Sequence, residues 1–316
     1  MLNTDRITIF VPHRISGFFE IVDKTEKGEK ITNPEKIGSR GAGFNLTAVG
    51  KTEIVIENKN FDLEPDCKVY INNDELNQKA ETTYFIYNFI KKLIKDPIKL
   101  KIYHNFDLPV GCGYGASGSG ALGAIFGLSS LLNLNLTCYE KGKIAHISEV
   151  INKTGLGTVC GQLAGGLCIL KESGYPCVSE QIMVPEDLNV ICGTFGAIHT
   201  KSILTSEELI DKIKIAGRTA LRKVMAEKSI ESFVKASINF VKETNILKIL
   251  NLKKTQELIE NLNRLNIIGA SMNQLGRSVF AFCKNKDVSK VLEVYNCFKP
   301  EIRIYKSNVN EIKPFF

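Results

Sequence analysis

The sequence predicts an α+β protein of two domains. The first half of its 316 residues mixes strand and helix patterns, and the second half follows the order strand, helices, strand, helix, strand. That second order is typical of a split βαβ sheet, here with an inserted helical block. The length exceeds one average domain, and prolines 176 and 185 indicate a linker. We therefore expect one domain over 1–180 and a second over 181–316.

The elements of the first half follow from two periodicities. Short runs of alternating apolar and polar residues predict strands, and apolar residues at helical spacing over Glu75–Lys95 predict an amphipathic helix. A continuous apolar run from Ala121 predicts a buried helix. The expected elements are strands over 7–19 (running into a Pro/Gly turn), 52–56, 68–71, 98–104 and 167–170, and helices over 75–95, from 121 and over 139–151.

The second half is predicted in the same way. Its strands are short apolar runs, and its helices are longer amphipathic segments. The expected elements are strands over 188–193, 278–282 and 302–305, and helical segments over 206–247, 255–265 and 288–298.

Composition excludes several classes of protein. The net charge of +7 comes from scattered lysines, which suits a solvated surface and helps to steer an anionic substrate. No arginine-rich stripe with aromatic residues points to nucleic acid, no apolar run reaches membrane-spanning length, and the N-terminus lacks a signal-peptide profile. We expect a cytoplasmic protein without nucleic-acid or membrane partners.

The nine cysteines predict reduced thiols. Their number is odd, no C-x-x-C pair occurs, and the loose cluster from Cys160 to Cys192 fits no zinc spacing. We expect buried, reduced side chains.

A glycine-rich loop between a predicted strand and a predicted helix is the most informative feature. Five glycines fall within residues 111–120. Glycines let backbone N–H groups approach an anion, and the unpaired N–H groups of a helix start add positive charge. The hydroxyls of Ser117 and Ser119 suit a metal ion on a phosphate. The pattern favours a phosphate site over a tight turn built for close packing.

Three common phosphate loops do not fit this context. Gly113–Gly118 matches G-x-G-x-x-G, but the next predicted segment is a helix and not the strand of a βαβ unit. No lysine follows the glycines as in a Walker loop. No His-Arg-Asp or Asp-Phe-Gly tripeptide supports a protein kinase.

The loop resembles the ATP loop of the GHMP kinase superfamily, Pro-x-x-x-Gly-Leu-Gly-Ser-Ser. Here Tyr114 replaces the leucine and Ala116 the first serine. The Gly17-Phe18-Phe19 ending of the first strand, with residues 38–43, is similar to the archaeal pantoate kinase branch. Residues 145–166 and 269–280 stand where later family motifs are found, the latter without most of its glycines. The resemblance implies an N-terminal domain like ribosomal protein S5 domain 2 and a ferredoxin-like C-terminal domain.

The resemblance also implies ATP and Mg²⁺. Ser117 and Glu149 match the family's magnesium ligands, and magnesium prefers such oxygen ligands. The residues expected to bind ATP are Pro109, Gly111, Gly113, Gly115, Ala116, Ser117, Gly118 and Ser119.

Substrate recognition calls for cations and hydrogen-bond donors. His146 lies three residues before Glu149 and therefore on the same face of its helix, where it is expected to contact the substrate carboxylate or the reacting hydroxyl. The alternative is a structural histidine. The candidates for substrate binding are His13, Arg14, Ser39, Arg40, His146, Thr200 and Lys201.

Thr158 stands where many GHMP kinases carry a catalytic aspartate. A threonine is no base near neutral pH, and no aspartate occurs between Asp107 and Asp187. Three explanations remain open. The reaction proceeds without a formal base, His146 or a distant carboxylate takes the proton, or the chain is an inactive relative.

These inferences lead to one functional expectation. By resemblance, the chain phosphorylates the primary hydroxyl of (R)-pantoate to 4-phosphopantoate for archaeal coenzyme A synthesis, and forms a homodimer. The alternatives are a GHMP kinase for another small alcohol, such as homoserine or mevalonate, and a nucleotide- or metabolite-binding protein without turnover.

Overall fold

The computed structural model describes residues 5–58, 66–198 and 207–314. Its N-terminal sheet is built on the long antiparallel pair β1 (Arg6–Val22) and β2 (Gly38–Asn58). The remaining strands are β3 (Asp66–Ile71), β4 (Asp74–Glu75), β5 (Lys99–Phe106), β6 (Leu167–Leu170) and β7 (Ser179–Ile182), in the order β4-β3-β5-β2-β6-β7 with β1 paired to β2. One end of β2 pairs with β5 and the other with β6.

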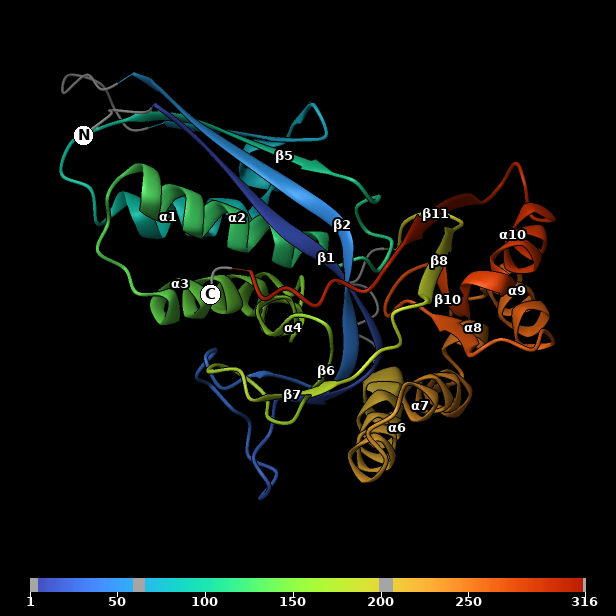
Figure 1. The fold of residues 1–316 in the computed structure, drawn as a ribbon. Helices are drawn as coiled ribbons and strands as arrows, with labels where there is room; N and C mark the ends of the chain where they lie inside the picture. Colours follow the sequence, from blue (N-terminus) through green and yellow to red (C-terminus); the bar gives the residue numbers. More distant parts are fainter. Residues whose placement is uncertain (1–4, 59–65, 199–206, 315–316) are drawn as a thin grey trace.

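Helices pack against this sheet. They are α1 (Glu81–Lys91), α2 (Ala116–Leu131), α3 (Cys138–Asn152) and α4 (Thr158–Ala164). Figure 1 shows α1 and α2 beneath the β1–β2–β5 part of the sheet, with α3 and α4 in the next layer. Since α2 is apolar all round, it is buried almost completely, as expected for a helix enclosed between a sheet and other helices.

The C-terminal part forms a second, four-stranded antiparallel sheet. Its order is β11-β8-β10-β9, which is the strand arrangement of a ferredoxin-like domain. Its elements are β8 (Leu188–Thr194), β9 (Gly269–Met272), β10 (Ser278–Lys284), α10 (Val288–Asn296) and β11 (Arg303–Ser307), with α6 (Glu207–Ala226), α7 (Ile230–Thr244), α8 (Ile246–Ile249) and α9 (Lys253–Asn263) inserted. The predicted split βαβ sheet with a helical block is confirmed.

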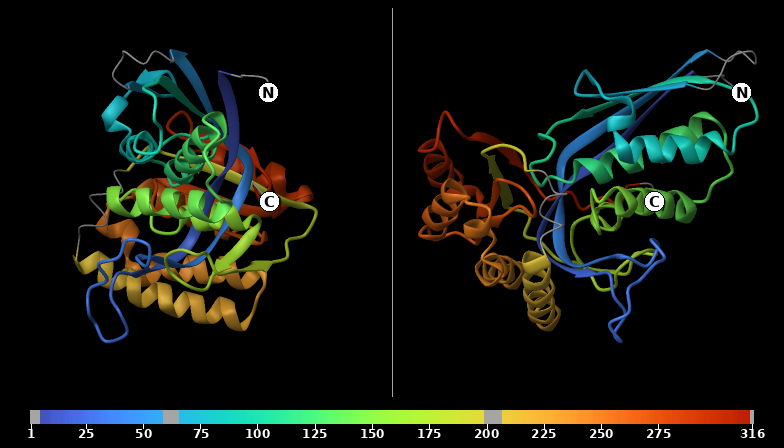
Figure 2. Two further views of the ribbon diagram at one scale, coloured as in Figure 1. Left: turned by 90° about the vertical axis from the view of Figure 1, so that its left-hand side faces the viewer. Right: turned by 180° about the vertical axis from the view of Figure 1, so that it is seen from behind.

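A shared aromatic core joins the two sheets. Phe44 of β2 lies 5.2 Å from Phe280, 4.7 Å from Phe282 and 6.0 Å from Phe233, measured between ring centroids. Figure 2 shows the consequence: the β1–β2 ribbon runs between α1–α3 on one side and the C-terminal sheet with its helices on the other. The division at 180/181, which falls inside β7, stays a prediction.

Several predicted boundaries differ from the structure. The first strand does not end in a Pro/Gly turn but continues through Pro12 and Gly17, with irregular register beside each. The helix expected from residue 75 begins at Glu81, since β4 and a 3₁₀ turn precede it. The helical block breaks where Ser229 caps α7 and where Asn245 takes a left-handed conformation.

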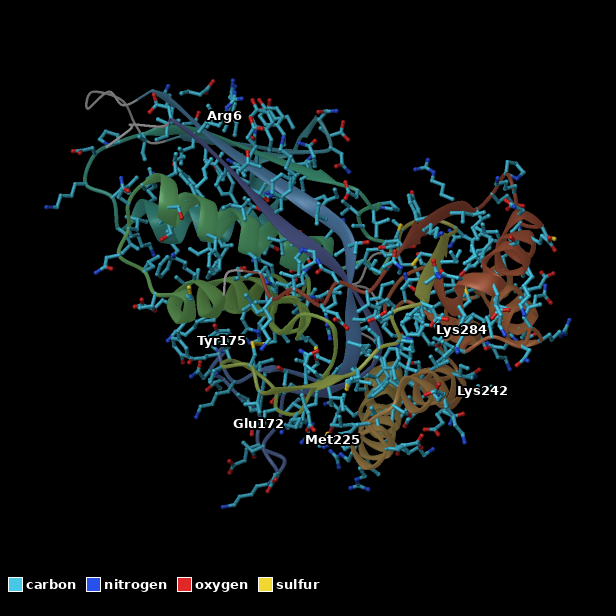
Figure 3. All side chains as sticks on the ribbon, in the orientation of Figure 1. Arg6, Glu172, Tyr175, Met225, Lys242 and Lys284 are labelled. Atoms are coloured by element: carbon cyan, nitrogen blue, oxygen red, sulfur yellow. A yellow bond between two sulfur atoms is a disulfide. The ribbon has the colours of Figure 1, made fainter. Side chains whose placement is uncertain are left out.

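The cysteine prediction was wrong in two respects: one pair is oxidised, and Cys138 and Cys297 are exposed rather than buried. Cys160 of α4 forms a disulfide with Cys177, whose Cα atom is 5.3 Å away. The expectation rested on count and spacing along the chain, whereas the fold brings β6, α4 and the following loop together. Tyr175, labelled in Figure 3, lies in that loop, below α3.

Candidate active site

The glycine-rich loop joins β5 to the N-terminus of α2. Gly111, Gly113 and Gly115 have φ values of 75°, 81° and 67°, in the left-handed region that favours glycine. Gly115 is the N-cap of α2, and no side chain caps the helix there. The first N–H groups of α2 are therefore available to an anion, as the sequence predicts.

Two segments hold the loop from behind. The turn after β9 packs against it so closely that a Cβ atom at Gly276 would lie 2.2 Å from the carbonyl oxygen of Cys112. On the other side, Nδ1 of His13 is 2.9 Å from the carbonyl oxygen of Tyr114, and Nε2 accepts a hydrogen bond from the N–H of Leu108. His13 is fully buried and does not line the cavity beside the loop. His13 thus supports the loop from behind, and its role in substrate binding stays a prediction.

A cavity of about 330 Å³ lies between the loop, the bend of β1 and β2, and residues 153–158. One part of its wall is apolar, formed by Phe18, Phe19, Ala42, Leu156, Leu170, Ile198 and Leu275. The polar part includes Arg14, Ser16, Ser39, Arg40, Ser117, Lys153, Thr154, Thr158 and Gln274. No carboxylate is among the described residues that line it.

Ser117 and Glu149 meet beside this cavity. The hydroxyl of Ser117 donates a hydrogen bond to Oε1 of Glu149 over 2.6 Å. Glu149 is 1% exposed, and burial raises the pKa of its carboxyl to about 7, although the hydrogen bonds from Ser117 and the Val159 backbone act in the opposite direction. Gly155 makes room for this carboxylate, because a Cβ atom there would lie 2.5 Å from Oε1.

This pair fits a magnesium ion. Magnesium takes oxygen ligands and usually keeps several waters, so that one carboxylate and one hydroxyl are a sufficient protein contribution. The carboxylate is desolvated and the hydroxyl opens on the cavity at the start of α2, where the phosphates of a nucleotide would also bind.

Thr158 is the first residue of α4 and lines the cavity. Its methyl group faces the loop, since a Cβ atom at Gly115 or at Gly118 would lie 2.9 Å from it. With Thr158 in this place and no described carboxylate on the cavity wall, none of the described wall residues is suited to remove a hydroxyl proton at neutral pH.

Arg14 is the most unusual group of the site. The residue is 2% exposed and lines the cavity, yet it makes no ion pair within the described part of the chain. Nη1 donates to Oδ1 of Asn45 over 3.3 Å, and Nε has no partner. Its guanidinium lies on α4, where a Cβ atom at Gly161 would be 1.9 Å from Nε. A buried cation without a carboxylate is costly, so this geometry calls for an anionic ligand in the cavity.

The predicted residues of β2 lie on the opposite wall. Ser39 and Arg40 both line the cavity, as expected. Nε and Nη2 of Arg40 donate to Oε2 of Glu20 over 3.1 and 2.8 Å, a partner that the sequence did not indicate. Thr200 and Lys201 lie outside the described residues.

His146 is separated from the cavity. It is 1% exposed, its Nε2 is 3.0 Å from the carbonyl oxygen of Ile37, and burial lowers the pKa of its ring. Although it shares a helix face with Glu149, the segment before β2 covers it. The structure thus places His146 behind the described cavity wall, and its catalytic or substrate-binding role stays a prediction.

The residues predicted to bind ATP divide into two groups. Gly111, Gly113, Gly115, Ala116 and Ser117 line the cavity. Pro109, Gly118 and Ser119 do not. The Ser119 hydroxyl donates to the carbonyl oxygen of Val11 and so is directed at β1, and Gly118 packs beneath Gln162.

Comparison with known proteins places this site in a family. Residues 82–166, which carry the loop, Glu149 and Thr158, match the model of the GHMP kinases N terminal domain. A pantoate kinase of Methanocaldococcus jannaschii is 31% identical over 90% of this chain and 96% of its own length. The chain belongs to the pantoate kinase family of GHMP kinases. The pantoate kinase of Thermococcus kodakarensis is 30% identical over 91% of each chain.

The fold comparison agrees with this membership in the pantoate kinase family. A solved structure described as a phosphotransferase related to the CoA biosynthesis pathway superposes with a TM-score of 0.84 at 27% identity, covering 98% of this chain and 97% of the other. The two-domain GHMP kinase fold is confirmed. Arg14, Arg40 and the turn after β9 lie outside the segment that the domain model matches, so the cavity combines family motifs with residues from both ends of the chain.

Proposed function

We propose that this chain transfers the γ-phosphoryl group of ATP to the primary hydroxyl of pantoate, giving ADP and 4-phosphopantoate, a step in coenzyme A synthesis. The observation that carries the proposal is the buried, unpaired guanidinium of Arg14 in a cavity that joins an anion-binding loop to an apolar wall. Pantoate has a carboxylate, two methyl groups on one carbon and a terminal hydroxyl. The cavity wall offers Arg40 for the carboxylate, apolar side chains for the methyl groups and Thr158 for the hydroxyl. The pantoate kinase relatives support the same substrate.

The protein's contribution is position and charge. The loop from Gly111 to Ser117 holds the nucleotide phosphates, and Ser117 and Glu149 hold magnesium, which when bound neutralises phosphate charge. Arg14 approaches the phosphoryl group in transfer, while Ser39 and Arg40 (with Thr200 as a further candidate) hold the carboxylate. The attacking oxygen forms its bond to phosphorus as the bond from the γ-phosphorus to the bridging oxygen breaks.

The hydroxyl proton leaves without a protein base in this proposal. Thr158 accepts and donates one hydrogen bond and so orients the hydroxyl, and the proton passes to a phosphoryl oxygen late in the reaction. A loose transition state makes orientation more important than early deprotonation.

The cavity also discriminates among related alcohols. Homoserine carries an ammonium group, which needs a carboxylate or carbonyl partner, and the described wall combines two guanidinium groups with Lys153 and no carboxylate. This charge pattern favours a substrate that is a pure anion. Mevalonate shares that property and is therefore the closer competitor.

An assay of ADP formation with pantoate, homoserine and mevalonate tests the proposal. We expect turnover with pantoate at least about 100-fold more efficient in kcat/KM than with either alternative, with the product identified by ³¹P NMR. If homoserine or mevalonate is turned over more efficiently than pantoate, that alcohol is the substrate and the proposal of pantoate is wrong. ATP binding without any turnover would favour the non-catalytic alternative.

The remaining expectations belong to the same proposal. We propose two structural domains, 1–180 and 181–316, in a homodimer in the cytoplasm of an archaeal cell, with no nucleic-acid or membrane partner. In the described ranges no helix is both long and apolar enough to cross a membrane. Sedimentation analysis of the purified protein tests the dimer.

A further inference from the structure

A second cavity adjoins the active-site cavity and shares Arg40 with it. This space of about 470 Å³ lies between α6 and the segment that follows β1. Three arginines line it, Arg40 from β2 and Arg218 and Arg222 from α6, together with Glu20 and Glu26. Met225, labelled in Figure 3, marks the C-terminal end of α6, the helix that carries Arg218 and Arg222.

A buried carboxylate organises two of the three arginines. The side chain of Glu20 is 2% exposed and accepts hydrogen bonds from Nε and Nη2 of Arg40 and, over 3.0 Å, from Nε of Arg218. One negative charge thus holds two guanidinium groups. Nη1 of Arg40 and both Nη atoms of Arg218 have no hydrogen-bond partner among the residues described.

The third arginine, Arg222, has no partner within the described ranges. Arg222 follows Arg218 by four residues, which places both on one face of α6. It is exposed and makes neither a hydrogen bond nor an ion pair with any described residue. Three arginines with unused N–H groups therefore line a cavity where, among the described residues, only Glu20, already engaged, and the exposed Glu26 supply negative charge.

We infer that this second cavity binds a small phosphate-type anion, at a site separate from the nucleotide loop. Guanidinium forks match the oxygens of phosphates in spacing and charge, and several forks on one ligand give strong, charge-assisted hydrogen bonds. Inorganic phosphate, pyrophosphate and the phosphate ester that the enzyme makes all share this chemistry.

The shared residue predicts how the second cavity affects the first. An anion there competes with Glu20 for Arg40 and draws its guanidinium away from the active-site cavity. If Arg40 holds the substrate carboxylate, occupancy raises the KM for pantoate and leaves the KM for ATP unchanged. This coupling rests on the proposed function, whereas the binding itself does not.

Calorimetric titration tests the binding. Pyrophosphate, phosphate or 4-phosphopantoate is added to full-length protein already saturated with Mg²⁺ and a non-hydrolysable ATP analogue, so that the nucleotide loop is filled. We expect Arg222→Ala to weaken binding of the anion by about tenfold or more, as for loss of a charge-assisted contact. Lys223→Ala is the matched control, since Lys223 is exposed on the same helix but does not line the cavity.

The outcomes separate the claims. Failure of all three anions to bind, or equal affinity in the two variants, overturns the site. The anion that binds most tightly identifies the source of the phosphate group. If the anion binds the control variant but not Arg222→Ala, the second anion site is supported even when the enzyme does not turn over pantoate. Binding without a rise in KM for pantoate overturns the coupling through Arg40.

Discussion

Replacing Arg14 by methionine separates function from stability more clearly than any other change in this site. Arg14 is buried and lines the active-site cavity, and its side chain hydrogen-bonds only Asn45 among the described residues. Methionine keeps an unbranched side chain against Gly161 and removes the charge. If the residue stabilises the fold, its replacement should lower the free energy of unfolding. If it binds an anionic ligand, its replacement should lower the activity instead.

The magnitudes follow from the geometry. A hydrogen bond to a charged group is worth about 1.5–3 kcal/mol, so loss of the guanidinium should lower kcat/KM about 10- to 100-fold. Burying a charge without a carboxylate costs the folded protein several kcal/mol, and loss of the bond to Asn45 offsets about 1.5–3 kcal/mol of the gain from removing that charge. The free energy of unfolding of the ligand-free protein should therefore stay equal or rise by about 1–2 kcal/mol. Arg14→Lys keeps the charge but not the fork, so its activity should lie between the two.

Urea unfolding and steady-state kinetics on the same preparations test this reasoning. Arg6→Met is the control, because Arg6 lies on the same strand with its side chain 68% exposed. We expect Arg6→Met to change neither quantity appreciably. The reasoning is refuted if Arg14→Met unfolds more easily than the unsubstituted protein while its kcat/KM stays within about twofold of the control.

Three further predictions concern the base, the metal ligand and a buried histidine. Thr158→Asp should not raise kcat, because a new carboxylate beside the loop pairs with the nearby guanidinium; a gain of about tenfold would show that a base has been lost. Gly155→Ala should raise the Mg²⁺ concentration for half-maximal activity by about tenfold, since its Cβ atom would displace the Glu149 carboxylate, whereas Gly120→Ala, with no atom closer than 3.5 Å, should not. Equal Mg²⁺ dependence in the two variants would contradict this role for Gly155. Burial lowers the pKa of His104 to about 4 from 6.5, so the unfolded chain binds a proton that the folded chain refuses, and stability present above pH 6.5 is lost as the pH falls toward 4. Between pH 7.5 and 4.5 this histidine should account for about 2.5 kcal/mol of lost unfolding free energy, and a His104→Gln variant with an unchanged pH dependence of urea unfolding would refute it.

Local patterns were sufficient for most of the fold. Alternation identified β5 and a short apolar run identified β8, because each signal depends on neighbours in the chain. The apolar run from Ala121 identified α2 but missed its first residues, since the helix begins at Ala116. The errors lie where distant segments decide. β1 continues past Pro12 and Gly17 because β2 pairs with it along nearly its whole length. Cys160 pairs with Cys177 because the chain folds back after β6.

The site shows the same division. The sequence by itself determined where the glycine-rich loop lies, that Ser117 and Glu149 form a pair, and that position 158 carries threonine where many GHMP kinases carry aspartate. These are properties of motifs. Only the tertiary structure decided that His13 and His146 contact backbone carbonyls, that Glu20 holds Arg40, and that Arg14 is buried with no carboxylate partner among the described residues. Burial and charge pairing depend on which segments meet in space, and a one-dimensional pattern does not contain that information.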